Sequence, residues 1–222
     1  MKISLLGFSF CILLTMACTN KKKHIIFFGD SITEVAVNRG GYIARMDSML
    51  AQQKKADQFE LTGAGVSGNK VYDLFLRMDD DVLAKNPDLV VIFIGVNDVW
   101  HKRTSGTGTD ADKFVKFYQA IIQKLKANNI EMILCTPAVI GEKTDFTNPL
   151  DGEMNEYSKI IRDLAGKNNL ALVDLRKIFR EYNLTNNPEN RTSGILTTDG
   201  VHLNAKGNQF VADEMWKVIQ AF

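Results

Sequence analysis

The sequence predicts an α/β fold, with a flavodoxin-like sheet of five parallel strands in the order 2-1-3-4-5 between two layers of helices. Two observations support this prediction. Short, continuous apolar runs, typical of strands buried on both faces, alternate with longer segments whose apolar residues recur at helical spacing. A helix between consecutive strands is the usual crossover of a parallel sheet, and such crossovers cover both of its faces. We therefore expect a three-layer αβα domain.

The expected strands are apolar runs bounded by turn residues. The first ends at a Gly-Asp pair, the third is the strongest pattern for a buried strand, and Pro137 ends the fourth. The five runs cover residues 24–28, 59–64, 89–95, 131–136 and 170–175.

The expected helices carry apolar residues on one face, at the spacing of the helical repeat. Asn86-Pro87 ends the second, because the residue before a proline disfavours helical backbone. The last helix closes the chain with Phe210, Met215 and Ile219 facing inward. The five helical segments cover residues 42–53, 71–83, 111–128, 154–167 and 205–222.

Composition limits the function classes. A chain of 222 residues is long enough for one domain with a sizeable core. Its 27 lysines and arginines balance 26 aspartates and glutamates, so it has no basic excess to bind a nucleic-acid backbone. Three cysteines cannot form a disulfide framework, and Cys135 lies in an apolar run that indicates a core position.

The first residues predict an export signal. Lys2 precedes a short apolar run, residues 3–17, that ends in a small residue before Cys18. This segment resembles a bacterial lipoprotein signal, which implies lipid attachment at Cys18 and a membrane-anchored protein of the cell envelope. An ordinary signal peptide, which would give a periplasmic or secreted protein, or an uncleaved anchor is the alternative. We expect a signal over residues 1–17, a polar tether over 18–23 and one domain over 24–222.

Polar residues and glycines follow the first three expected strands. Ser31 comes after the first, Gly68 ends a glycine-rich turn after the second, and Asn97 follows the third. In an open parallel sheet these strand ends form the site. A serine there can be a nucleophile, and a glycine N–H and an asparagine amide can hold an oxyanion. Taken singly, each is equally typical of a helix cap or a turn.

A loop near the C-terminus adds an acid and a base. Asp199 and His202 are three residues apart around a glycine, so the carboxylate can reach the imidazole and fix its tautomer. Of the other two histidines, His24 begins a strand and His101 follows Trp100 beyond the third strand, where it can line the site. A surface loop with an idle histidine is the alternative. Serine, base, orienting acid and oxyanion donors together are the requirements of acyl transfer.

Cofactor motifs are missing from the sequence. It contains neither G-x-G-x-x-G nor G-x-x-x-x-G-K-[ST], and no Cys/His cluster has zinc spacing. We therefore expect no nucleotide and no metal or other cofactor.

These blocks together resemble the SGNH hydrolases, also called the GDSL-like lipases/acylhydrolases. The matching segments are Gly29-Asp30-Ser31, Gly65 to Gly68, Gly95 to Asp98, and Asp199 to His202. The resemblance implies a catalytic triad of Ser31, His202 and Asp199, with an oxyanion hole made by Ser31, Gly68 and Asn97. One departure is Gly63, where the family often has asparagine.

The resemblance implies a serine esterase. The segment 102–112 is polar and glycine-rich, and no long apolar insertion could form a deep acyl tunnel. We therefore expect short acyl groups, with O-acetylated carbohydrate as the substrate. A lipase or lysophospholipase acting on lipid esters is the alternative, and a non-catalytic carbohydrate-binding lipoprotein is a remote one. The sequence does not indicate an oligomeric state.

Overall fold

A computed structural model describes residues 21–222. Its sheet has five parallel strands in the order β2-β1-β3-β4-β5, which confirms the predicted fold class and strand order. The predicted export signal and the first part of the predicted tether lie outside the described residues. The strands are β1 (Lys23–Gly29), β2 (Phe59–Gly65), β3 (Leu89–Phe93), β4 (Glu131–Cys135) and β5 (Ala171–Val173).

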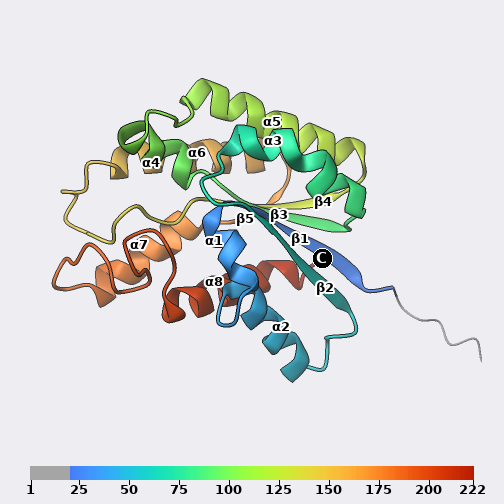
Figure 1. Cartoon of the computed structure of the whole chain (residues 1–222). Helices are drawn as coiled ribbons and strands as arrows, with labels where there is room; N and C mark the ends of the chain where they lie inside the picture. The colour runs from blue at the N-terminus through green and yellow to red at the C-terminus, as the bar shows by residue number, and fades with distance from the viewer. Residues whose placement is uncertain (1–20) are drawn as a thin grey trace, which may run out of the picture.

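Helices cover both faces of the sheet. Helices α3, α5 and α6 lie on one face, and α2 and α8 on the other (Figure 1). The helical elements are α1 (Ser31–Glu34), the 3-10 turn η1 (Val35–Val37), α2 (Tyr42–Gln52), α3 (Val71–Asp81), η2 (Leu83–Lys85), α4 (Val96–Thr104), α5 (Ala111–Ala127), α6 (Asp151–Asn168), α7 (Leu175–Asn186) and α8 (Ala205–Ile219).

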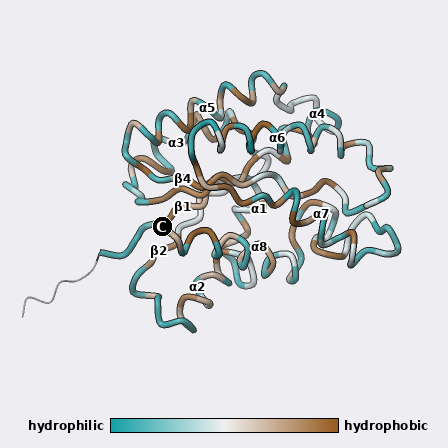
Figure 2. Tube along the Cα trace, turned by 180° about the vertical axis from the view of Figure 1, so that it is seen from behind, coloured by the Kyte–Doolittle hydropathy of each residue, from teal (hydrophilic) through white to brown (hydrophobic). Residues whose placement is uncertain are grey.

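The core follows the sheet. Every residue of β3 is buried, as are the last five of β1, which explains why both strands are continuous apolar runs. Figure 2 shows the hydrophobic colouring concentrated along the strands and the hydrophilic colouring on outer turns. The buried Tyr42 packs edge-on against Phe27 and donates its hydroxyl to Thr33 Oγ1 at 2.9 Å, so the first helical segment is fixed to the sheet.

Besides the short α1, two longer helices, α4 and α7, lie outside the helical segments expected from the sequence, and tertiary contacts stabilise their first turns. In α4 the buried Asp98 accepts the Val71 N–H at 3.1 Å. Asn97-Asp98, which by itself is typical of a turn, therefore lies in the first turn of a helix. In α7 the N-cap Asp174 accepts the Lys177 N–H and pairs with Arg162. The strand expected over 170–175 consequently ends at Val173.

Over residues 21–222, no helix is both long and apolar enough to cross a bilayer.

Candidate active site

Parallel strands bring three of the predicted site residues to one edge of the sheet. Ser31 begins α1 after β1, Gly68 lies in the turn after β2, and Asn97 is in the first turn of α4 after β3. Asp199 and His202 lie on the connection between α7 and α8, and the contact of His202 with Ser31 places them at the same edge.

A chain of hydrogen bonds joins Ser31, His202 and Asp199. Ser31 Oγ lies 3.0 Å from His202 Nε2, and His202 Nδ1 lies 2.7 Å from Asp199 Oδ2. With the Nδ1 proton directed at the carboxylate, Nε2 is left to accept the serine proton. This is the arrangement of a nucleophile, a base and an orienting acid.

Backbone donors fix the Asp199 carboxylate. Its Oδ1 accepts the N–H groups of Val201 at 2.9 Å and His202 at 2.8 Å. Partial burial would raise the pKa of Asp199, but hydrogen bonds from the His202 side chain and from the backbone outweigh it and lower the pKa. Asp199 is therefore ionised at neutral pH and can stabilise an imidazolium.

Asp30 precedes Ser31 and caps the helix that begins there. It is only 2% exposed, and its Oδ1 caps α1 by accepting the Ile32 N–H at 3.0 Å. Burial raises the pKa of Asp30 to about 7, and the negative charge of Asp98 acts in the same direction. The helix that begins at Ser31 is thus held by a carboxyl group that titrates near neutral pH.

Gly68 and Asn97 belong to one hydrogen-bonded unit. Gly68 has a φ of +76°, a left-handed conformation that favours glycine. Asn97 is 3% exposed, and its Nδ2 donates to the Asn69 carbonyl at 3.1 Å, which fixes the amide against the glycine-rich turn. The second N–H of the same nitrogen is left for a ligand.

Arg77, in the middle of α3, was not predicted from the sequence. Its Nη2 donates to the carbonyls of Gly29 at 2.8 Å and Ala64 at 3.0 Å, and its Nε donates to Asn69 Oδ1 at 2.6 Å. The guanidinium also lies over the Phe28 ring, 4.6 Å from its centre. One side chain therefore ties the ends of β1 and β2 to the glycine-rich turn.

Glu142 holds the acid–base loop, which is the connection between α7 and α8 that carries Asp199 and His202. Like Arg77, it was not predicted from the sequence. The residue is 1% exposed, and its carboxylate accepts the N–H groups of Ile195 at 2.8 Å, Leu196 at 2.6 Å and Thr197 at 3.1 Å. Nothing in its local sequence, Ile140-Gly141-Glu142-Lys143, indicates such a contact.

His101 lies beside the glycine-rich turn, as the sequence allowed. A methyl group placed on Gly68 would come 3.9 Å from His101 Cε1. Burial lowers the pKa of His101, and the positive charge of Lys70 lowers it further. Lys70 Nζ in turn donates to the Gly68 carbonyl at 3.0 Å.

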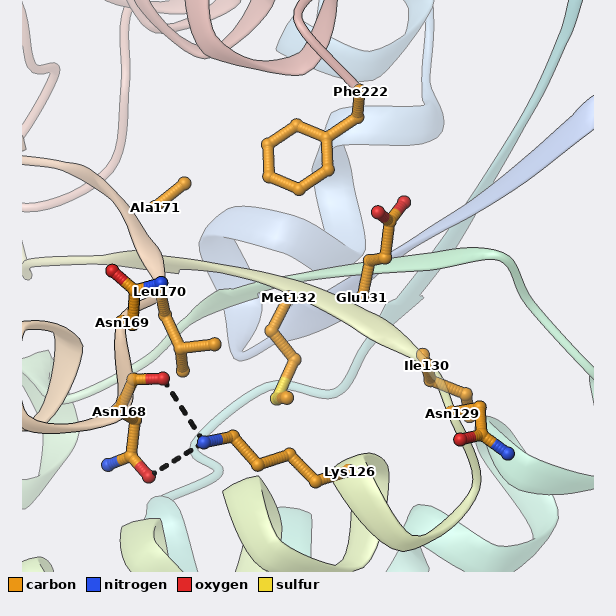
Figure 3. Close-up of a pocket in the computed structure, with 10 residues that line it drawn as sticks. All are labelled: Lys126, Asn129, Ile130, Glu131, Met132, Asn168, Asn169, Leu170, Ala171 and Phe222. Carbon is orange, nitrogen blue, oxygen red and sulfur yellow. Dashed lines mark hydrogen bonds between the residues drawn. The ribbon is translucent and has the colours of Figure 1, made fainter.

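Another hollow, shown in Figure 3, lies at the opposite edge of the sheet. It has a volume of about 470 Å³, and Met132, Leu170 and Phe222 line it. Lys126 Nζ donates there to the carbonyl and Oδ1 of Asn168, both at 3.1 Å. Its residues stand where β4 and β5 begin, so it is separated from Ser31 by the length of the sheet.

Over residues 21–222, no three His, Cys, Asp or Glu side chains come together as they would around a metal ion.

Comparison with known proteins gives one consistent result. A model of the GDSL-like Lipase/Acylhydrolase family matches residues 27–210. The chain is similar to a solved acetyl xylan esterase, AlAXEase, with 63% identity and a TM-score of 0.88, over 88% of this chain and 99% of that one. It is 29% identical to an acetylxylan esterase of Geobacillus stearothermophilus, over 86% of this chain and 90% of that protein. An uncharacterized lipoprotein of Bacillus subtilis, YqeF, is 26% identical over 85% of this chain and 86% of its own length.

Proposed function

Because the chain belongs to the GDSL-like lipase/acylhydrolase family and is a carboxylic ester hydrolase, we propose that it removes O-acetyl groups from carbohydrate through an acetyl-serine intermediate. The observation that supports the chemistry is the hydrogen-bond chain from Ser31 through His202 to Asp199. The observation that supports the substrate is the 63% identity to an acetyl xylan esterase along nearly the whole of that chain.

In the first half-reaction, Ser31 Oγ attacks the acetyl carbonyl carbon while His202 Nε2 takes the hydroxyl proton. Asp199 keeps the imidazole in the required tautomer and stabilises its positive charge. The tetrahedral intermediate then collapses, the bond to the sugar oxygen breaks, and His202 returns the proton to that leaving oxygen. The sugar departs as an alcohol and Ser31 carries the acetyl group.

The carbonyl oxygen becomes negatively charged in the tetrahedral intermediate. We assign its stabilisation to the N–H groups of Ser31 and Gly68 and to the Asn97 amide. Because the Asn97 side chain is already held by the Asn69 carbonyl, little reorganisation is needed when the charge develops.

The second half-reaction repeats these roles with water. His202 removes a proton from the water, whose oxygen attacks the acetyl carbon, and the bond to Ser31 Oγ breaks as His202 protonates it. Acetate leaves, and the free serine is restored.

Acetate release from acetylated xylo-oligosaccharides tests the proposal. The wild type should release acetate, and Ser31→Ala should lose activity while remaining folded. Ser105→Ala, at an exposed serine after α4, serves as the matched control and should retain activity. A series of p-nitrophenyl esters should give the highest kcat/KM at two carbons.

Two results would contradict this function. A rise in kcat/KM toward long acyl chains, together with faster hydrolysis of a lysophospholipid, would favour a lipid esterase. Binding of the oligosaccharide without hydrolysis of any ester would favour a carbohydrate-binding protein.

We further propose that the enzyme is exported and anchored at the cell envelope through a lipid on Cys18. The similarity to a lipoprotein supports this, as does the direction of the chain: β1 begins at Lys23, and Ser31 follows its other end. An anchored tether would then hold the catalytic edge away from the membrane, toward polymeric substrates.

Cys18→Ala should move the protein from the membrane to the soluble fraction. A mature N-terminus elsewhere, without an acyl chain, would instead indicate a periplasmic or secreted enzyme.

A further inference from the structure

Two neighbouring hollows lie on the side of the molecule formed by η1, α2 and α8. The first, of about 350 Å³, is lined by Val35, Asn38, Arg39, Arg45, Ala205 and Asn208. The second, of about 440 Å³, is lined by Arg39 and Arg45 again, with Ser48, Gln52 and Gln209. Because the two hollows share both arginines, they adjoin each other; we call the pair the depression, and each hollow is of a size that suits a ligand.

The first hollow adjoins the candidate active site. Val35 follows directly after α1, one helical turn from Ser31, and Ala205 begins α8 only three residues after His202. A polymer whose acetyl group is at Ser31 would extend into this depression with its neighbouring sugar units.

Within the described residues, neither arginine of the depression forms an ion pair with a carboxylate. Arg45 donates its Nε to the Gly40 carbonyl at 2.7 Å and its Nη1 to Gln209 Oε1 at 2.9 Å, and both acceptors are neutral. Within residues 21–222, Arg39 is exposed and forms neither a hydrogen bond nor an ion pair, and no aspartate or glutamate lines either hollow. Asp213, on the same helix as Gln209, is engaged with the Gln209 amide at 2.9 Å.

The absence of a carboxylate partner distinguishes Arg39 and Arg45 from three arginines that support the fold. Arg77, Arg162 and Arg176 each pair with an aspartate. Arg45 is instead half-buried and oriented by neutral groups, with Nη2 left over, and Arg39 can move toward a ligand beside it. Guanidinium groups match the two oxygens of a carboxylate, and a neutral surround leaves their charge available.

We propose that Arg39 and Arg45 form a subsite for a carboxylate carried by the glycan, so that the preferred substrate is an acetylated oligosaccharide containing a uronic acid. This inference rests on the proposed carbohydrate esterase function and adds the class of glycan. Neutral sugars would enter the same depression but would leave both guanidinium groups without an anionic partner.

The test compares two acetylated oligosaccharides that differ only in one uronic acid, present in one and reduced to the neutral sugar in the other. The wild type should show about tenfold higher kcat/KM on the acidic substrate, the effect of one charge-assisted hydrogen bond at a partly exposed site. The preference should shrink as salt is added, because exposed charges are screened. Arg39→Gln and Arg45→Gln should each reduce it, while hydrolysis of p-nitrophenyl acetate stays unchanged.

Arg103→Gln is the matched control, since Arg103 is exposed and, among the described residues, its guanidinium forms one hydrogen bond, to the Pro149 carbonyl at 3.3 Å. This variant should keep the full preference. Equal kcat/KM on the two substrates, or a preference that survives in Arg39→Gln, would overturn the subsite. A change of molecular mass in Arg39→Gln would assign the arginines to a contact between copies and would also overturn it.

A second readout separates this inference from the proposed function. Ser31→Ala protein is titrated with the deacetylated acidic oligosaccharide and with its neutral counterpart. Tighter binding of the acidic form supports the subsite even if neither acetylated glycan is hydrolysed, a result that would contradict the carbohydrate esterase function alone. Equal binding of the two would overturn the subsite.

Discussion

The two halves of the candidate active site are held in place in different ways. Ser31, Gly68 and Asn97 follow strands whose positions are set by packing in a buried sheet. Asp199 and His202 lie on a connection with no helix or regular strand between α7 and α8. That connection is fastened by hydrogen bonds, above all those of three backbone N–H groups to Glu142. Hydrophobic packing thus orders one half of the site, and a buried carboxylate orders the other.

The largest effect is expected on the half that the sheet carries. Asn97→Ala should lower kcat about 10²–10³-fold with KM little changed, because an oxyanion donor acts on the transition state more than on the bound ester. Steady-state kinetics on p-nitrophenyl acetate, with thermal unfolding of the same preparation, checks this. A destabilised variant whose folded fraction keeps normal kcat would reduce Asn97 to a structural residue.

The same division explains what the sequence could predict. Strand ends are recognisable, because an apolar run that stops at Gly29-Asp30-Ser31 marks both the element and the site. The fold class and strand order were predicted correctly for this reason. The roles of Arg77 and Glu142 could not be found from the sequence. The strand-end carbonyls that Arg77 holds lie 48 and 13 residues from it, and the N–H groups that Glu142 holds lie at least 53 residues away. Helix α4 was missed because a buried contact of Asp98 converts a turn signal into a helix start.

The half carried by the loop should respond to Glu142→Gln. An amide in place of the carboxylate removes the charge from three hydrogen bonds and sets a donor against a backbone N–H, which should cost about 1–3 kcal/mol of stability. If the loop then holds His202 less well, kcat should fall about tenfold. Denaturant unfolding and kinetics measure the two effects.

Glu153→Gln is the control for that experiment, since Glu153 pairs with Lys102 on α4 and does not touch the loop. It should lose stability without losing kcat. A Glu142→Gln enzyme that is destabilised to the same extent but retains full kcat would show that packing alone orders the acid–base loop.

A smaller effect is expected from Arg77→Met. The change removes the hydrogen bonds from Arg77 to the Gly29 and Ala64 carbonyls and to Asn69 Oδ1, so the glycine-rich turn should shift slightly. We expect kcat to fall about fivefold, and the affinity for a boronic acid transition-state analogue to fall in parallel, with KM unchanged. Arg162→Met removes a comparable pair of bonds, to Asp174, at a place remote from the turn. Equal losses of kcat in both variants would argue against a specific role for Arg77.

The last prediction concerns Asp30 and the pH dependence of stability rather than kcat. Its pKa rises from 3.8 to about 7 on folding, so the folded protein keeps a proton that the unfolded chain releases above pH 4. Stability should therefore fall as the pH rises from about 4 to about 7, by a few kcal/mol at most for this group. In Asp30→Asn, which preserves the helix cap, the free energy of unfolding should vary less over this range. An identical slope in both proteins would mean that Asp30 is ionised throughout.

The most direct test of the account is the identity of the residue that reacts with a fluorophosphonate. This reagent phosphonylates the activated serine of serine hydrolases, and peptide mass spectrometry locates the modified residue. Wild type should be labelled at Ser31 as esterase activity is lost, and His202→Ala should be labelled far more slowly because the hydroxyl has lost its base. Loss of activity with the label on another residue and Ser31 unmodified would contradict the assignment of the nucleophile, and with it the mechanism built on this edge of the sheet.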